Sequence, residues 1–211
     1  MKELPSESKR KSLLAMTAGY GLILATLWTE KQLQRELFSL TAAYFVVVAA
    51  FTLWRKPLRP PGLKFSLVVI SLGAMIAGTV MWIGFASGTL HGLFGIRNAA
   101  LHASSYVLWT VVQQYLQQDF FFVRIEQFIS RGVFASLVTA ALFGLAHLPN
   151  PVLTPITFAG GFILSELFRR YRSFVPLGVA QGLVGLALAV SVPDQTMHHM
   201  RVGLGYLHYR G

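Results

Sequence analysis

The chain has 211 residues, of which 54% are hydrophobic and only 12% are charged, and its mean hydropathy is +0.56. Because a soluble globular domain carries about 25% charged residues, this composition excludes an ordinary soluble domain and indicates an integral membrane protein. The formal net charge is +10, and cysteine is absent, which rules out disulfides and thiolate metal sites.

Long apolar runs follow one another along the chain, separated by charged or proline-rich segments. Residues 1–11 form a basic leader, but no small-residue cleavage site follows the first run, so we expect a membrane span and not a signal peptide. Three prolines interrupt residues 55–64, and the glycine-rich residues 87–98 are expected to form a re-entrant or interfacial turn. The predicted spans are residues 12–28, 37–54, 65–86, 99–123 and 132–148, a sixth run that reaches Phe168, and residues 174–192.

The sequence thus predicts an all-α fold, a polytopic transmembrane helical bundle of about seven helices (six to eight) with a cytoplasmic N-terminus. In this topology thirteen Lys and Arg residues lie inside and five outside, the asymmetry typical of multi-pass proteins. Anionic lipid on the inner face then accounts for the positive charge, and no nucleic-acid partner is predicted. We expect a plasma or inner membrane protein with a leader and three helices (1–98), a four-helix core (99–192) and a polar tail (193–211).

The predicted fourth span carries a polar stripe. At about 100° per residue, polar and aromatic side chains gather on one narrow arc of this helix. They are His102, Tyr106, Trp109, Thr110, Gln113 and Gln117, with Gln114 and Gln118 beside them. Amides that face lipid lack hydrogen bonds, so the stripe must face protein or a water-filled cavity. Adhesion between helices at about 0.6 kcal/mol per contact is one interpretation, but four amides and a histidine favour a functional cavity.

The fifth predicted span ends in Phe143-Gly-Leu-Ala-His147, which resembles the second motif of the CPBP family. This family, also called Abi, comprises the CAAX-type prenyl endopeptidases and bacteriocin-processing intramembrane proteases. Its first motif is a pair of glutamates followed by an arginine, about one helix earlier. Its third motif is a histidine followed by an asparagine, about one helix later. The resemblance covers roughly residues 99–192.

The charged positions of those motifs are neutral in this chain. The residues that stand there are Gln113 and Gln114 for the glutamate pair, Gln118 for the arginine, Gln181 for the last histidine and Gly185 for the asparagine. Gln113 and Gln181 each lie 34 residues from His147, spacings similar to those of the family. A second register, with Gln117 and Gln118 at the glutamate pair, contains no charge either.

The resemblance implies hydrolysis of a peptide bond, in which a glutamate activates water while histidine and asparagine stabilise the oxyanion. Glutamine binds water but does not take up its proton, and loss of the general base costs about 10²–10⁴ in rate. If the chain is a protease, Asp119, Glu166 or His147 itself must serve as the base, with Gln113, Gln114 and Gln181 as polar positioning groups. The predicted substrate contacts are Gln117, Gln118, Phe143, Asn150, His102 and Trp109.

Three functions remain open from the sequence. The first is a CAAX-type intramembrane endopeptidase with degenerate motifs, acting on a membrane-associated peptide or prenylated protein. The second is a catalytically inactive scaffold or substrate-binding protein of the same fold, and the third is a small transporter. Membrane lipids are expected partners in each case, and the cofactor is left open. We predict no metal site, because His147 has no second clear ligand nearby and the histidines of the tail, His198, His199 and His208, read as solvated.

Overall fold

The computed structural model describes residues 6–55, 62–91 and 98–209, and within them the chain is helical, with no strand. The predicted all-α class is therefore confirmed for this part of the chain. The long helices are α1 (Ser6–Leu27), α2 (Lys31–Arg55), α3 (Leu63–Ala86), α4 (Ala99–Gln114), α6 (Gly132–Leu145), α7 (Leu153–Tyr171) and α8 (Val175–Ser191). Parts of the basic leader, the proline-rich segment and the predicted interfacial turn lie outside the described residues.

The predicted fourth span is not one regular α-helix. After α4 the chain continues as a π-helix, η1 (Tyr115–Phe122), and then as the short α5 (Val123–Ile125). A π-helix bonds each residue to the fifth one along and therefore turns less per residue than an α-helix. As a result Gln117 and Gln118 are both buried, and so are the three phenylalanines at 120–122.

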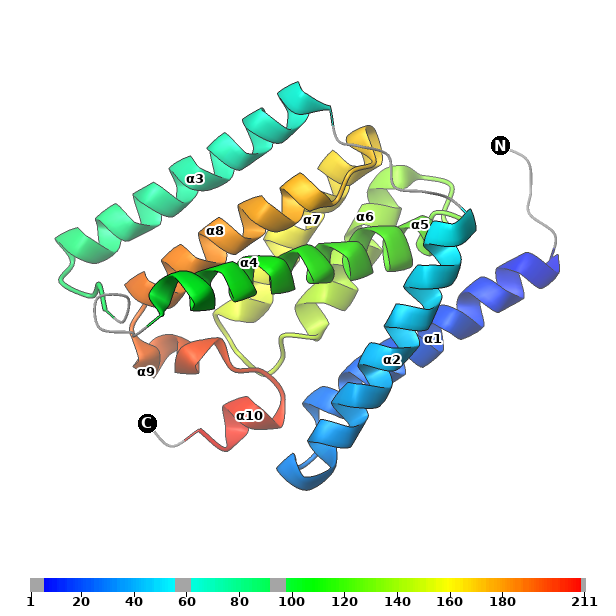
Figure 1. Cartoon of the computed structure of the whole chain (residues 1–211), viewed down its shortest axis with the longest axis horizontal. Coiled ribbons are helices and arrows are strands. Elements are labelled where there is room, and N and C mark those ends of the chain that lie inside the picture. Colours follow the sequence, from blue (N-terminus) through cyan, green and yellow to red (C-terminus); the bar gives the residue numbers. More distant parts are fainter. Residues whose placement is uncertain (1–5, 56–61, 92–97, 210–211) are drawn as a thin grey trace.

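Helix α8 lies between α3 and α4 (Figure 1). Small residues permit this close approach, as in many membrane helix pairs. A Cβ atom at Gly73 of α3 would lie 2.8 Å from the Cβ of Ala180, and one at Gly178 would lie 2.5 Å from the Cα of Val111. The hydroxyl of Thr110 also donates to the carbonyl of Gly178 over 2.9 Å. These contacts fix the register in which α8 presents Gln181 to α4.

Helices α1 and α2 form a hairpin to one side of α4, while α6 and α7 pack together behind it (Figure 1). The hydroxyl of Tyr20 on α1 donates to the carbonyl of Leu142 on α6 over 3.0 Å. On the other side of the hairpin, the rings of Phe45 and Phe120 meet edge to face with centroids 5.0 Å apart. The hairpin is thus joined to the body at both of its helices.

Two described helical segments, Lys31–Thr52 within α2 and Leu63–Ala86, are long and apolar enough to cross a bilayer. Large apolar side chains on their outer faces are exposed, among them Val47 at 68% and Trp82 at 69%. Exposure of this kind over whole helices is costly in water and favourable in lipid.

The segment after α8, which was predicted as a polar tail, contains short helices in its described part. It contains α9 (Asp194–Met197), a 3₁₀ turn (His198–Met200) and α10 (Leu204–Leu207). His198 stacks on Tyr206 with ring centroids 4.3 Å apart, and His199 pairs with Asp194 at 2.8 Å. The backbone of three consecutive residues here, 198–200, has positive φ, a conformation that non-glycine residues adopt at a cost.

Candidate functional site: amides on the wall of an apolar cavity

A cavity of about 940 Å³ lies between the α1–α2 hairpin and the rest of the bundle. Its wall is built from all seven long helices, from the π-helix η1 and from two residues of the C-terminal segment, Met200 and Val202. Most of the lining side chains are aliphatic or aromatic, and no Asp, Glu, Lys or Arg is among the described residues that line it. The polar groups on the wall are hydroxyls, amides and the imidazole of His147.

Five glutamines form one hydrogen-bonded network across α4, η1 and α8. Gln114 is its centre, because its Nε2 donates to Oε1 of Gln117 and to Oε1 of Gln181, each over 2.7 Å. Its Oε1 in turn accepts a 3.0 Å bond from Gln118. Gln181 then donates to Oε1 of Gln113 over 2.7 Å. Such a network satisfies most of its polar atoms inside the protein, as buried amides require.

The network is attached to α7 through Gln117. Its Nε2 donates to the carbonyl of Gly161 over 3.1 Å and approaches the hydroxyl of Ser165 at 3.4 Å. A side chain at 161 is not compatible with this contact, since a Cβ there would lie 2.8 Å from that nitrogen. Three helical segments that are distant in sequence are therefore joined at one polar centre.

His147 lies just beyond the end of α6, on the wall of the same cavity. Its Nδ1 is 2.7 Å from the carbonyl of Phe143, and the Phe143 ring meets the imidazole edge-on with centroids 4.8 Å apart. A carbonyl only accepts, so Nδ1 carries the proton in this contact and Nε2 of the neutral ring is left as an acceptor.

The structure brings half of the predicted site residues to the cavity wall. These are Gln113, Gln117, Gln181, His147, Phe143 and Trp109. Gln114 and Gln118 are fully buried behind the wall, where they hold the other amides in place. Among the described residues, Oε1 of Gln118 is buried without a hydrogen-bond partner.

The two carboxylates predicted as alternative bases are not on the cavity wall. Glu166 faces α6 and its own helix: it accepts a 2.7 Å bond from the hydroxyl of Ser136 and pairs with Arg169 at 2.7 Å. Asp119 is half-buried on η1, on the side where its charge acts on Arg124. Neither carboxylate is among the described residues that line the cavity, where the sequence interpretation had expected a base.

Asn150 and His102 are also placed elsewhere than predicted. The Asn150 side chain is fully buried, and its Oδ1 accepts from the amides of Val152 and Leu153 at the start of α7. Its Nδ2 donates to the carbonyls of Met197 and Arg201, so the residue holds the C-terminal segment, and it is not among the residues that line the cavity. His102 is exposed at the beginning of α4 and does not line the cavity.

Three participants were not predicted as site residues. Gly161 and Ser165 hold the amide of Gln117, and Tyr106 places its hydroxyl against Gly185 on the cavity wall. Tyr106 was visible as a member of the polar stripe. The spacing of Gly161 and Ser165, one helical turn apart on α7, was the only sequence signal for that pair.

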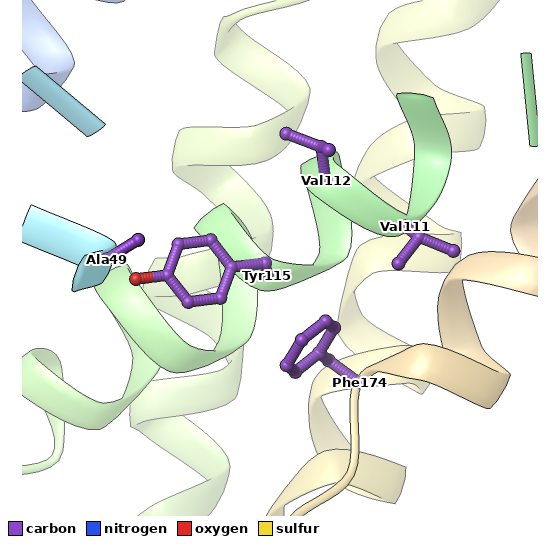
Figure 2. A pocket seen from close by; sticks show the side chains of 5 residues that line it. All are labelled: Ala49, Val111, Val112, Tyr115 and Phe174. Carbon is purple, nitrogen blue, oxygen red and sulfur yellow. The ribbon is translucent and has the colours of Figure 1, made fainter. Parts of the chain in front are cut away.

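A second, smaller cavity of about 220 Å³ lies beside α4. Figure 2 shows its lining, with Ala49 of α2, the ring of Tyr115 and Phe174 next to two valines of α4. No polar side chain other than that of Tyr115 takes part in it, so it is packing space and not a chemical site. In the described part of the chain, no three His, Cys, Asp or Glu side chains gather as a metal site would require.

These features define a class of protein: a helical bundle with an outer apolar surface and polar groups turned inward to a largely apolar cavity, as expected of a membrane-embedded protein. Residues 20–187 match the family model described as type II CAAX prenyl endopeptidase Rce1-like, and the chain belongs to this family. The family is membrane-embedded, and the suggested resemblance to CPBP proteins is confirmed. The match also takes in the last eight residues of α1 and all of α2 and α3. No curated protein and no solved structure matches the chain.

Proposed function

We propose that this chain is a multi-pass membrane protein that binds a membrane-associated peptide segment, such as that of a prenylated protein, in its cavity and does not hydrolyse it. The observation that carries the proposal is the composition of the cavity wall, where no charged side chain occurs among the described residues. The family suggests that the ligand is a peptide, and the absence of a charged side chain from the described cavity wall argues against its hydrolysis.

Hydrolysis of a peptide bond requires a group that removes a proton from the attacking water. Gln113 does not do so, because an amide is not protonated at physiological pH, and its Oε1 already accepts a bond from Gln181. Gln114 is fully buried and makes three bonds to neighbouring amides. Without a general base the rate falls by about 10²–10⁴, so this arrangement supports binding.

The cavity is suited to an apolar segment of chain. Its volume of about 940 Å³ falls within the range of about 300–1,000 Å³ that is usual for ligand pockets. Apolar walls with a small number of oriented polar groups are typical of sites that take up a hydrophobic ligand and fix its orientation. A prenyl group or apolar side chains would occupy the wall, and main-chain groups would meet the amides.

In the membrane we place the long helices as spans, with the N-terminus on the cytoplasmic side. This arrangement is supported by the predominance of Lys and Arg in the segments that would lie inside. The basic C-terminal end of α7, with Arg169, Arg170 and Arg172, would then lie at the inner leaflet and contact anionic headgroups.

One observation favours a hydrolytic alternative. The Nδ1 proton of His147 is used by Phe143, which leaves Nε2 as a proton acceptor on the cavity wall. An imidazole in this tautomer is a competent general base. In this alternative His147 would activate the water, and the glutamine amides would donate to the oxyanion.

The deciding experiment uses the purified full-length protein in liposomes and an internally quenched apolar peptide that carries a photo-crosslinker. We expect a light-dependent adduct with the mass of the intact peptide, and fluorescence that stays at the level of empty liposomes. His147→Ala is compared with His208→Ala, a matched loss of an exposed imidazole.

Failure of the peptide to crosslink contradicts the binding proposal. Cleavage by the wild-type protein that His147→Ala abolishes and His208→Ala retains contradicts the non-hydrolytic proposal and establishes the alternative. Thermal melting of each variant, recorded in the same detergent, separates loss of function from loss of fold.

A further inference from the structure

One backbone carbonyl, that of Gly161, determines how the side-chain amides of the glutamine network are oriented. The carbonyl of Gly161 only accepts hydrogen bonds, so the side-chain group of Gln117 that faces it at 3.1 Å must be the NH₂ group. Oε1 of Gln117 is therefore turned toward Gln114. This assignment rests on the backbone and not on a choice between two equivalent amide rotamers.

The same logic passes along the network to the cavity. Because Gln114 faces Oε1 of Gln117, its NH₂ group must be the donor in this contact. The second N–H of the same group donates to Oε1 of Gln181. The NH₂ group of Gln181 then faces Oε1 of Gln113 over 2.7 Å. The oxygen of Gln113 is thereby used, and its NH₂ group is the part left for the cavity that this side chain lines.

Tyr106 supplies a second donor on the same face of α4, seven residues before Gln113 and about 10 Å away along the helix axis. Its ring lies against Gly185 of α8, where a Cβ atom would collide with the hydroxyl. Among the described residues this hydroxyl has no hydrogen-bond partner, and Tyr106 lines the cavity.

We propose that the NH₂ group of Gln113 and the hydroxyl of Tyr106 select the ligand by donating to its uncharged carbonyl oxygens, so that the cavity takes up a neutral amide or ester carbonyl. This inference rests on the proposed binding function and adds the chemistry of recognition to it. A protonated amine would bring only donors and a charge to these two groups, and a bare hydrocarbon would leave them without a partner in an apolar cavity, which is costly.

The test compares methyl dodecyl ketone with tetradecane, which has the same number of carbons and no acceptor. Binding of the radiolabelled compounds to full-length protein in detergent is measured by scintillation proximity. Gln113→Met, which keeps the length of the side chain, should weaken ketone binding about five- to tenfold and leave tetradecane binding unchanged. Tyr106→Phe removes a single oxygen and should weaken ketone binding about two- to fivefold.

The control is Gln32→Met, which makes the same chemical change at an exposed position of α2. Equal losses for ketone and tetradecane, or no loss for either, overturn the inference. If Gln113→Met does not fold, Tyr106→Phe carries the test by the same comparison.

Two further probes distinguish a peptide carbonyl from a lipid ester carbonyl. They also distinguish failure of the carbonyl inference from failure of the proposed peptide binding. Acetyl-trileucine N-methylamide offers peptide carbonyls, and methyl laurate offers a lipid ester. Peptide binding that depends on Gln113 supports both proposals. If the ester binds in a Gln113-dependent way and the peptide does not bind at all, the carbonyl inference stands and the proposed peptide function fails.

Discussion

Nε2 of Gln181 lies 2.7 Å from Oε1 of Gln113 and links α8 to α4 at the cavity wall. Behind this pair, Oε1 of Gln181 accepts from Gln114, which is completely buried. Two neighbouring glutamines of one helix thus have different tasks. Gln114 bonds to three other glutamines of the network, whereas Gln113 bonds to Gln181 alone and lines the cavity.

This difference predicts unequal effects of the same substitution. Gln114→Glu would place a carboxylate against the oxygens of Gln117 and Gln181, so that acceptors oppose one another in a buried site. We expect a loss of about 2–4 kcal/mol in the free energy of unfolding. Gln113→Glu keeps the acceptor for Gln181 and stands on the cavity wall instead of behind it, so its loss should be the smaller of the two. Thermal denaturation of the two variants in detergent measures the difference, and equal losses would argue against the assigned network.

A second prediction concerns gain of hydrolysis. Gln113→Glu introduces a carboxylate on a cavity wall that already carries His147. We expect cleavage of the quenched apolar peptide to appear at about 10² times the wild-type background, because a general base contributes a factor of at least this size. The double variant with His147→Ala should return to background. A single variant that binds the peptide but stays inactive would show that the remaining residues do not support hydrolysis.

The adjacent glycines of α7 provide a matched pair for a third prediction. In Gly161→Ala the new methyl group would lie 2.8 Å from Nε2 of Gln117 and displace the amide from its anchor. A Cβ atom at Gly160 would have no neighbouring atom within 4 Å, so the methyl group of Gly160→Ala fits without a clash. We expect Gly161→Ala to lose about 1–3 kcal/mol of stability and Gly160→Ala to gain up to about 1 kcal/mol from helix propensity. Melting temperatures check both, and a neutral Gly161→Ala would contradict the anchoring role.

A fourth prediction concerns the C-terminal segment. Asn150→Asp keeps the oxygen that accepts from Val152 and Leu153 but removes the donor to Met197 and Arg201. We expect the segment to detach while α7 remains capped, so that trypsin cleaves after the exposed Arg201 at least about tenfold faster. Asn150→Ala should in addition lower the free energy of unfolding by about 2–4 kcal/mol. Unchanged proteolysis in Asn150→Asp would show that other contacts hold the segment.

The helices were predictable because each apolar run is long and bounded by charges or prolines, which are local features. The π-helix was not, since its wider turn depends on how the phenylalanines at 120–122 pack and not on the residues of the turn alone. His102 and Gln114 both lie in the regular α-helix α4, so their case is different: the helical angle alone does not tell that the first is exposed and the second is at the centre of the network.

The site was predictable only in part, because some of its features are local in the sequence and others depend on tertiary contacts. An amide inside an apolar run signals a polar contact wherever the fold brings it, so Gln113 and Gln117 could be identified from the polar stripe. Gln181 was identified from the spacing of the family's motifs. The bonds that join these amides to α7 and α8 could not be identified, because those partners lie 44 to 68 residues apart. The same holds for Asn150, whose acceptors follow 47 and 51 residues later.

A cavity whose described wall carries no formal charge has an electrical consequence. Carrying one elementary charge through a potential of 100 mV takes about 2.3 kcal/mol, but an uncharged guest entering an uncharged chamber does no such work. Occupancy should accordingly be the same in energised and de-energised vesicles, and should instead follow how much of the guest the surrounding bilayer dissolves.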